Sequence, residues 1–158
     1  MFYHELGGLT ISALGFGCMR LPTKDGHIDE PEAEKLFARA YECGVNYYDT
    51  AYNYHNMESE PFVGRFFSKL PRETFFLATK FPAWKAETIE EARDIFEFQM
   101  KNLQTDHIDF YLIHALSKER WDKINQIGIP QLLEEYQRQG RIVKLGFSFH
   151  DSYEAFEE

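Results

Sequence analysis

Short runs of apolar residues alternate along the chain with segments in which apolar residues recur every three or four positions. The apolar runs lie at residues 14–19, 45–50, 74–80, 108–114 and 144–150. Nearly continuous apolar runs of this length predict buried strands of the kind found in parallel sheets. Ahead of them, two short strand-like stretches flank Gly7 and Gly8, which predicts a β-hairpin.

The segments between the apolar runs have the period of amphipathic helices. Helices are predicted at about 30–43, 59–70, 88–103 and 119–139, the last one interrupted near residues 127–130. Asp29 with Glu32, and Thr88 with Glu91, have the spacing of capping boxes. Strands that alternate with helices in this way predict an α/β protein with a parallel sheet covered by helices on one or both faces.

No low-complexity tract or linker interrupts residues 1–158, so we expect a single domain. Near the end of the chain, Asp151 and Glu154 have the spacing to cap another helix, which stops after barely two turns. A helix this short buries little surface, and no strand follows it. We therefore expect the chain to be part of a larger fold.

Composition narrows the class of protein. Apolar residues make up 44% of the chain and charged residues 27%, as in soluble globular proteins. The formal charge of −9 argues against nucleic acid or an anionic membrane surface as a partner, because both are bound through Lys and Arg. No apolar run approaches the roughly 18 residues that cross a bilayer, and no signal peptide is recognisable. Cys18 and Cys43 are expected to be buried thiols of a cytoplasmic protein.

Polar residues lie near the carboxyl ends of four successive predicted strands. Asp49, Lys80, His114 and Ser148 are separated by 31, 34 and 34 residues, the length of a strand–helix–strand unit. The carboxyl ends of parallel strands converge on one cleft, where α/β folds place their chemistry. Each residue alone has a structural explanation, such as a loop cap or a core histidine. Four of them in one layer favour a functional site.

Tyr54, five residues after Asp49, gives this layer an acid. A phenol is a weak acid at neutral pH, and a neighbouring ammonium group favours its phenolate. Asp49 could keep Lys80 charged, and His114 could hydrogen-bond a substrate oxygen. This set favours the polarisation of a carbonyl group over hydrolysis, because no serine or cysteine nucleophile is paired with the histidine.

Other chemistries have weaker support. The segment GFGCMR has Arg20 where a dinucleotide fingerprint has its third glycine, and a loop follows it instead of a helix. A metal site built from Asp49, His114 and His150 lacks the usual ligand spacings, so no metal is expected. Tyr52 and Trp84, near strand ends, either line a substrate pocket or pack under loops.

Six segments in order along the chain resemble the successive signatures of the aldo-keto reductases: LGFGCMRLP, GVNYYDTAYNY, SEPFVG, LATK, LQTDHIDFYLIH and GRIVKLGFSFH. The resemblance implies an eight-stranded (β/α)8 TIM barrel with a hairpin that plugs its amino-terminal end. It also implies that hydride from NADPH or NADH reduces the carbonyl of a small-molecule aldehyde or ketone to an alcohol. Matched by motif, the catalytic tetrad is Asp49, Tyr54, Lys80 and His114, with Tyr54 as the general acid. Ser148 matches a residue that hydrogen-bonds the nicotinamide carboxamide.

The chain departs from the family pattern after its fifth predicted strand. It has Ser148-Phe149-His150 where the family often has Ser-Asn. The segment GFSFH resembles a branch whose members can carry a C-terminal ferredoxin-like segment with iron–sulfur clusters. Nothing of that segment is present here, so no iron–sulfur cluster is expected in this chain.

Length decides what is expected of the isolated chain. A full barrel takes about 250 residues, whereas this chain supplies the hairpin and about five βα units. We therefore expect the isolated chain to be inactive or nearly so, and its open sheet edges to allow self-association. Two alternatives stay open, a non-catalytic binding or regulatory protein on the same barrel and a hydrolase. The sequence leaves the substrate, and the choice between NADP and NAD, undecided.

Overall fold

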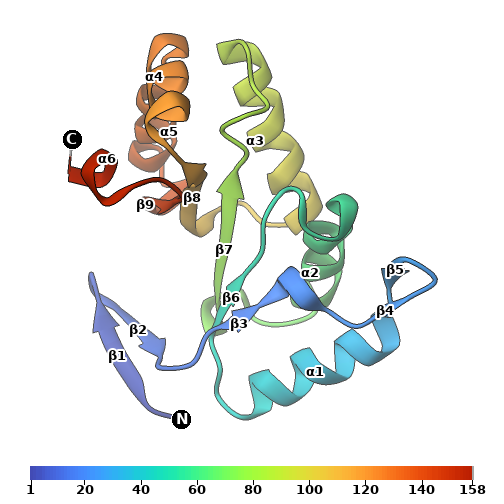
Figure 1. Cartoon of the computed structure of the whole chain (residues 1–158). Helices are drawn as coiled ribbons and strands as arrows, with labels where there is room; N and C mark the ends of the chain where they lie inside the picture. Colours follow the sequence, from blue (N-terminus) through green and yellow to red (C-terminus); the bar gives the residue numbers. More distant parts are fainter. Residues whose placement is uncertain (158) are drawn as a thin grey trace.

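A five-stranded parallel sheet forms the centre of the computed structural model, which describes residues 1–157 (Figure 1). Its strands, in spatial order, are β3 (Phe16–Gly17), β6 (Tyr47–Asp49), β7 (Phe76–Phe81), β8 (Ile108–Leu116) and β9 (Ile142–Phe149). Each strand pairs in parallel with the one that precedes it in the sheet. The five strands predicted from the apolar runs are confirmed, and so is their parallel arrangement.

Helices connect these strands, and one further helix follows the last strand. They are α1 (Glu30–Glu42), α2 (Ser59–Phe67), α3 (Ile89–Leu103), α4 (Lys118–Ile127), α5 (Ile129–Arg138) and α6 (Tyr153–Glu157). Two single-turn 3-10 helices, η1 (Cys18–Arg20) and η3 (Arg72–Thr74), lie in the loops of the described residues, and η2 (Tyr54–Met57) is a turn in which His55 and Asn56 have non-helical backbone angles. The predicted interruption of the fourth helical region falls at Gly128, whose φ of 87° ends α4, and α5 starts directly after it with Pro130 in its first turn.

Aromatic side chains join the sheet to the helices. The Tyr48 ring of β6 packs on Phe37 of α1 and Phe67 of α2, with ring centroids 5.6 and 4.4 Å away. Further along the sheet, Tyr111 of β8 meets Phe96 of α3 at 5.2 Å. Side chains along a strand alternate between the two faces of the sheet. Tyr48 and Tyr111 therefore mark the face that packs on the helices, and the residues next to them in each strand point to the opposite face.

The hairpin predicted around Gly7 and Gly8 is confirmed as β1 (Tyr3–Leu6) paired antiparallel with β2 (Leu9–Ser12). The side chain of Asn46, just before β6, accepts a hydrogen bond from the Ser12 amide and donates one to the Thr10 carbonyl. The hairpin therefore lies at the amino-terminal end of the sheet, as the resemblance implied.

A second hairpin was missed. The strands β4 (Thr23–Lys24) and β5 (His27–Ile28) pair around Asp25 and Gly26, whose φ angles of 53° and 86° are both positive. An Asp-Gly dipeptide is a strong signal for this type of two-residue turn. The signal was present in the sequence, but the neighbouring strands are only two residues long.

Two local expectations were wrong. Cys43, which follows α1, is exposed, and only Cys18 is a buried thiol. The Asp151 carboxylate does not cap α6, because it accepts hydrogen bonds from the amides of Lys118 and Ser152. The Ser152 hydroxyl accepts from the Ala155 amide instead.

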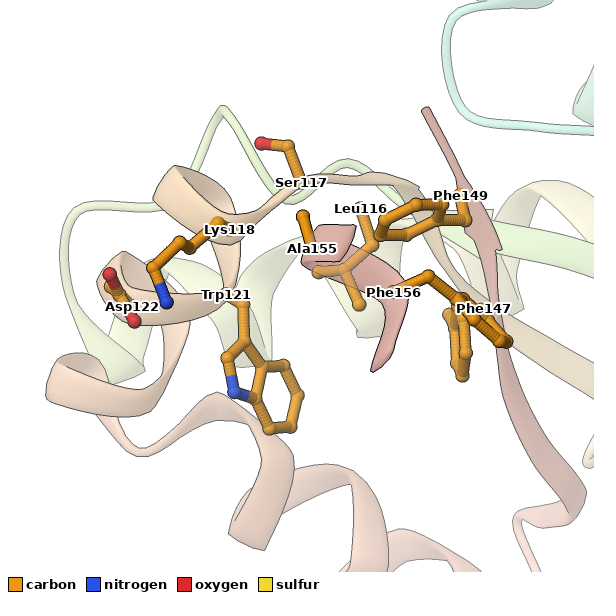
Figure 2. Close-up of a pocket in the computed structure, with 9 residues that line it drawn as sticks. All are labelled: Leu116, Ser117, Lys118, Trp121, Asp122, Phe147, Phe149, Ala155 and Phe156. Carbon is orange, nitrogen blue, oxygen red and sulfur yellow. The ribbon is translucent and has the colours of Figure 1, made fainter. Parts of the chain in front are cut away.

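An apolar groove of about 420 Å³ lies between β9, α4 and α6 (Figure 2). Its lining includes Leu116, Trp121, Phe147, Phe149 and Phe156. Phe147 and Phe149 are the neighbours of Ser148 along β9, so their side chains point to the face of the sheet opposite that of Ser148. The groove therefore lies on the other side of the sheet from the residues that the sequence singled out.

Candidate active site

The pairing register places the predicted site residues on one face of the sheet. Asp49 pairs with Ala78, and Lys80 pairs with Leu112. Paired residues of parallel strands point to the same side, and every second residue along a strand returns to it. Lys80 therefore faces the same way as Asp49, and His114 the same way as Leu112.

The ammonium group of Lys80 is the centre of the site. Its Nζ donates hydrogen bonds to Asp49 Oδ1 at 2.6 Å, to the Thr50 carbonyl at 2.8 Å and to the Tyr54 hydroxyl at 3.1 Å. Only 7% of the Lys80 side chain is exposed, against 27% of Asp49. A buried ammonium requires such a carboxylate partner, because the alternative is an uncompensated charge. Asp49 thus holds a charged group against the oxygen of Tyr54.

An unusual turn fixes the position of Tyr54. The three residues that follow it, His55, Asn56 and Met57, have φ angles of 49°, 51° and 71°. Residues with side chains rarely adopt this left-handed conformation, and it persists where the surroundings impose it. The Nε2 atom of His55 accepts a hydrogen bond from the Leu21 amide at 3.1 Å, which ties the turn to the loop after β3.

His114 lies beside Tyr54. The two rings meet edge to face with their centroids 6.0 Å apart. Burial, with a contribution from the Lys80 charge, lowers the pKa of His114 to about 4, so its imidazole is neutral at neutral pH. Its Nδ1 atom is buried and has no hydrogen-bond partner among residues 1–157. A buried polar atom of this kind needs a partner, and a bound molecule can supply one.

Ser148 is two residues beyond Gly146, which pairs with Leu112, so it lies on the face that His114 occupies. Its Oγ atom accepts a hydrogen bond from the Ala115 amide at 2.8 Å. A hydroxyl can donate one hydrogen bond as well as accept, and within residues 1–157 the Ser148 hydrogen has no acceptor. Ser148 can therefore donate to a ligand while it holds Ala115.

The two aromatic residues named from the sequence differ in their surroundings. Trp84 lies next to the site, with its ring centroid 5.2 Å from that of His114 and 38% of the residue exposed. Tyr52 packs against Phe98 of α3 and beneath the Lys85 ammonium. The structure thus brings Trp84, but not Tyr52, into contact with the four central residues.

A buried carboxyl group on the helix-covered face of the sheet was not predicted from the sequence. Glu60 of α2 accepts hydrogen bonds from the Thr79 hydroxyl at 2.6 Å and from Gln99 Nε2 at 2.5 Å. Gln99 also donates to the main-chain carbonyl of Lys80 at 3.1 Å. Burial raises the pKa of Glu60 to about 7, although these hydrogen bonds oppose the shift. The available signal was a glutamate two residues ahead of the apolar pair Phe62 and Val63.

Among residues 1–157, no three His, Cys, Asp or Glu side chains lie close enough together to hold a metal ion. In the same range, no helix is both long and apolar enough to cross a bilayer.

The geometry suits proton donation to an oxygen atom. A phenol that donates to a substrate oxygen is left with a negative charge, and an ammonium 3.1 Å away stabilises that charge in place. A neutral imidazole beside the phenol can donate a second hydrogen bond to the same oxygen. These are the requirements for general acid catalysis on a polarised C=O group.

Comparisons with known proteins point to one family. The profile of the Aldo/keto reductase family matches residues 13–158. A probable aldo-keto reductase from Glycine max is 34% identical over 150 residues, 89% of this chain and 42% of that protein. L-galactose dehydrogenase from Arabidopsis thaliana is 28% identical over 146 residues, 89% of this chain and 46% of that protein. The solved holo form of an aldo-keto reductase from Bacillus halodurans aligns with a TM-score of 0.80 and 31% identity, over 94% of this chain and 50% of its own.

The chain spans about half the length of these relatives. Its parallel strands and helices correspond to that share of the (β/α)8 barrel of the solved aldo-keto reductases, so the expected fold class is confirmed. The matched profile covers nearly the whole chain and includes every strand of the central sheet. The chain therefore belongs to the aldo/keto reductase family of oxidoreductases.

Proposed function

We propose that residues 1–158 carry the acid–base part of a site that reduces the carbonyl group of a small aldehyde or ketone. The observation that carries this proposal is the Lys80 ammonium, which bonds both the Asp49 carboxylate and the Tyr54 hydroxyl. A non-catalytic scaffold has no physical need for a buried ion pair beneath a tyrosine, because buried ion pairs contribute little to stability. The contacts of Lys80 therefore favour catalysis over a purely structural or binding role.

Each residue has a distinct part. Tyr54 donates its hydroxyl proton to the carbonyl oxygen as that oxygen becomes an alcohol. The Lys80 ammonium stabilises the phenolate that Tyr54 becomes, and Asp49 keeps Lys80 charged. His114, neutral at physiological pH, orients the carbonyl oxygen through a hydrogen bond from its ring.

The reaction requires a hydride donor, and the residues present fit a nicotinamide. The Ser148 hydroxyl has a hydrogen to donate, as the oxygen of a carboxamide requires. Bound NADPH or NADH supplies the hydride. Relatives of this chain include an aldo-keto reductase from Schizosaccharomyces pombe whose name carries NADP(+) and an NADH-specific methylglyoxal reductase from Escherichia coli. We accordingly assign this chain a nicotinamide cofactor without choosing between the two.

We further propose that the isolated 158-residue chain turns over little or no substrate. Its sheet ends at β3 and β9, and each of these strands pairs on one side only. Unpaired edges invite association, so copies of the isolated chain are expected to self-associate through them. We place the protein in the cytoplasm, since a reducing compartment suits the unpaired thiols of Cys18 and Cys43.

A fusion protein tests the catalytic proposal. Residues 1–158 are joined to the remaining strands and helices of the Bacillus halodurans relative, and oxidation of NADPH and NADH is followed with a reactive aldehyde. Tyr54→Phe should remove nearly all turnover and leave cofactor binding in place, because it deletes only the proton donor. Tyr41→Phe is the matched control, since Tyr41 lies on α1 and bonds Thr74 at the other end of the sheet.

A folded fusion that binds cofactor but reduces no carbonyl compound contradicts the proposed reaction. Retention of turnover by Tyr54→Phe contradicts the role of Tyr54 alone. Measurable turnover by the unfused chain contradicts the expected inactivity of the isolated chain.

A further inference from the structure

Arg120 contacts the candidate site from outside the sheet. It is the third residue of α4, and its Nη1 donates a hydrogen bond to the main-chain carbonyl of Ala115. Its guanidinium carbon lies 5.6 Å from the centroid of the Trp84 ring. Its place is therefore set by a peptide group and an indole ring.

The peptide that Arg120 bonds belongs to a strained position. Ala115 has a φ of 51°, and the register between β8 and β9 shifts between Ile113 and Leu116. The left-handed conformation costs roughly 1–2 kcal/mol for a residue with a side chain, so neighbouring groups must impose it. Ser148 Oγ accepts from the Ala115 amide, and Arg120 donates to the Ala115 carbonyl. Both polar atoms of the residue that follows His114 are thus fixed by side chains.

The indole ring that Arg120 covers is the same one that packs on His114. Trp84 lies 5.2 Å from the His114 ring and 5.6 Å from the guanidinium group. Arg120 therefore acts on His114 by two routes, through the main chain of Ala115 and through the side chain of Trp84. Its positive charge also helps to keep His114 neutral, after burial and the charges of Lys80 and His150.

We propose that Arg120 is a positioning residue that fixes the orientation of the His114 ring in the candidate site. The inference rests on the proposed function, in which the His114 imidazole hydrogen-bonds the carbonyl oxygen. Arg120 itself does not contact the reacting atoms in this arrangement. Because a guanidinium group is planar and carries several donors, it can bond a carbonyl and stack on a ring at the same time, which a lysine does less well.

NMR of the histidine-labelled chain tests this without any need for turnover. The His114 signals are identified by their loss in His114→Gln. In the wild type, ring protons of His114 and Trp84 should show a mutual nuclear Overhauser effect, and His114 should titrate near pH 4. In Arg120→Gln that effect should largely disappear. The titration midpoint of His114 should rise, because one nearby positive charge is gone.

Two further variants keep the test decisive. Arg120→Met keeps the aliphatic stem on Trp84 and should stay folded, yet it should change both readouts in the same direction. Arg138→Gln removes an exposed arginine from the far end of α5 and should change neither. The proposal is overturned if folded Arg120→Gln or Arg120→Met keeps the wild-type ring contact and titration. It is also overturned if Arg138→Gln has the same effects.

The proposed reaction and the positioning role fail by different observations. Absence of turnover in the folded, cofactor-binding fusion contradicts the reaction, whereas unchanged NMR readouts contradict the role of Arg120. In an active fusion, Arg120→Gln should lower kcat more than it raises KM, because a misplaced His114 weakens stabilisation of the transition state more than binding of the substrate. Equal losses from Arg138→Gln contradict the role of Arg120.

Discussion

The carboxyl group of Glu60 accepts a hydrogen bond from the hydroxyl of Thr79, 2.6 Å away in the interior of the protein. Thr79 directly precedes Lys80, so this acid lies on the opposite face of β7 from the Lys80 side chain. Gln99 bonds both Glu60 and the Lys80 carbonyl. Lys80 is therefore held on both faces of the sheet, by Asp49 at its side chain and by Gln99 at its main chain.

Glu60 makes stability depend on pH. Its pKa of about 7 in the folded state exceeds the ordinary 4.5, so the folded state binds the proton more tightly than the unfolded state. The resulting stabilisation is present below about pH 4.5 and is lost as pH rises through about 7. The Glu60→Gln variant should not lose this stability as pH rises. Its free energy of unfolding minus that of the wild type should therefore increase by roughly 2–3 kcal/mol from the acid to the alkaline end of that range. Urea unfolding of both proteins at about pH 5 and pH 8 measures it, and an equal difference at both values contradicts the prediction.

His114 has the opposite dependence. Its folded-state pKa of about 4 lies below the ordinary 6.5, so the unfolded state takes up the proton first. Stability should fall as pH drops from about 6.5 to about 4. Because the ring is only half buried, we expect roughly 1–2 kcal/mol over this window. The free energy of unfolding of His114→Gln should lack this decrease between about pH 6.5 and pH 4. If the variant loses as much stability in acid as the wild type does, groups other than His114 cause the loss.

Gly64 allows α2 and α3 to touch. A Cβ atom at this position would lie 2.1 Å from the Asn102 carbonyl oxygen and 2.8 Å from the main-chain carbon of Leu103. Main-chain atoms of a helix move only if the helix moves, so Gly64→Ala should cost about 3 kcal/mol or more. Gly17→Ala is the control, because a Cβ there meets no atom within 4 Å. Thermal unfolding compares them, and a similar midpoint for both variants rules out the close approach.

Met57 is the last of the three left-handed residues after Tyr54, and 46% of it is exposed. Glycine adopts this conformation without the steric cost, but it also gives the unfolded chain more freedom. Met57→Gly should therefore stabilise the protein by about 0.5–1 kcal/mol. Met19→Gly, the same change within the 3-10 helix η1, should destabilise it. Stabilisation by both changes, or by neither, would mean that the turn is not strained.

The layer of polar residues at the carboxyl ends of the strands could be predicted, because it depends on how far apart these residues are along the chain. Asp49, Lys80 and His114 recur at the length of a strand–helix–strand unit, and the alternation of side chains along strands then fixes their common face. Whether these residues catalyse a reaction stays a prediction. Glu60 could not be found this way, because its burial depends on the contact of α2 with α3.

Ala115 and Arg120 show the same limit. The left-handed position after His114 is occupied by alanine, so no glycine marks it in the sequence. Arg120 reaches the site only because α4 starts directly after the irregular end of β8. Such relationships arise from contacts between elements, and no local pattern of residues encodes them.

The agreement between spatial and chain order in the sheet has a consequence for biosynthesis. In the series β3, β6, β7, β8 and β9, each strand after β3 forms hydrogen bonds with the member that precedes it in the series. During translation, every newly emerged strand of this series and its helix can therefore dock onto a strand that the ribosome has already released. The sheet can thus grow in one direction, and the side chains of the candidate site are added in the order Asp49, Lys80, His114, Ser148.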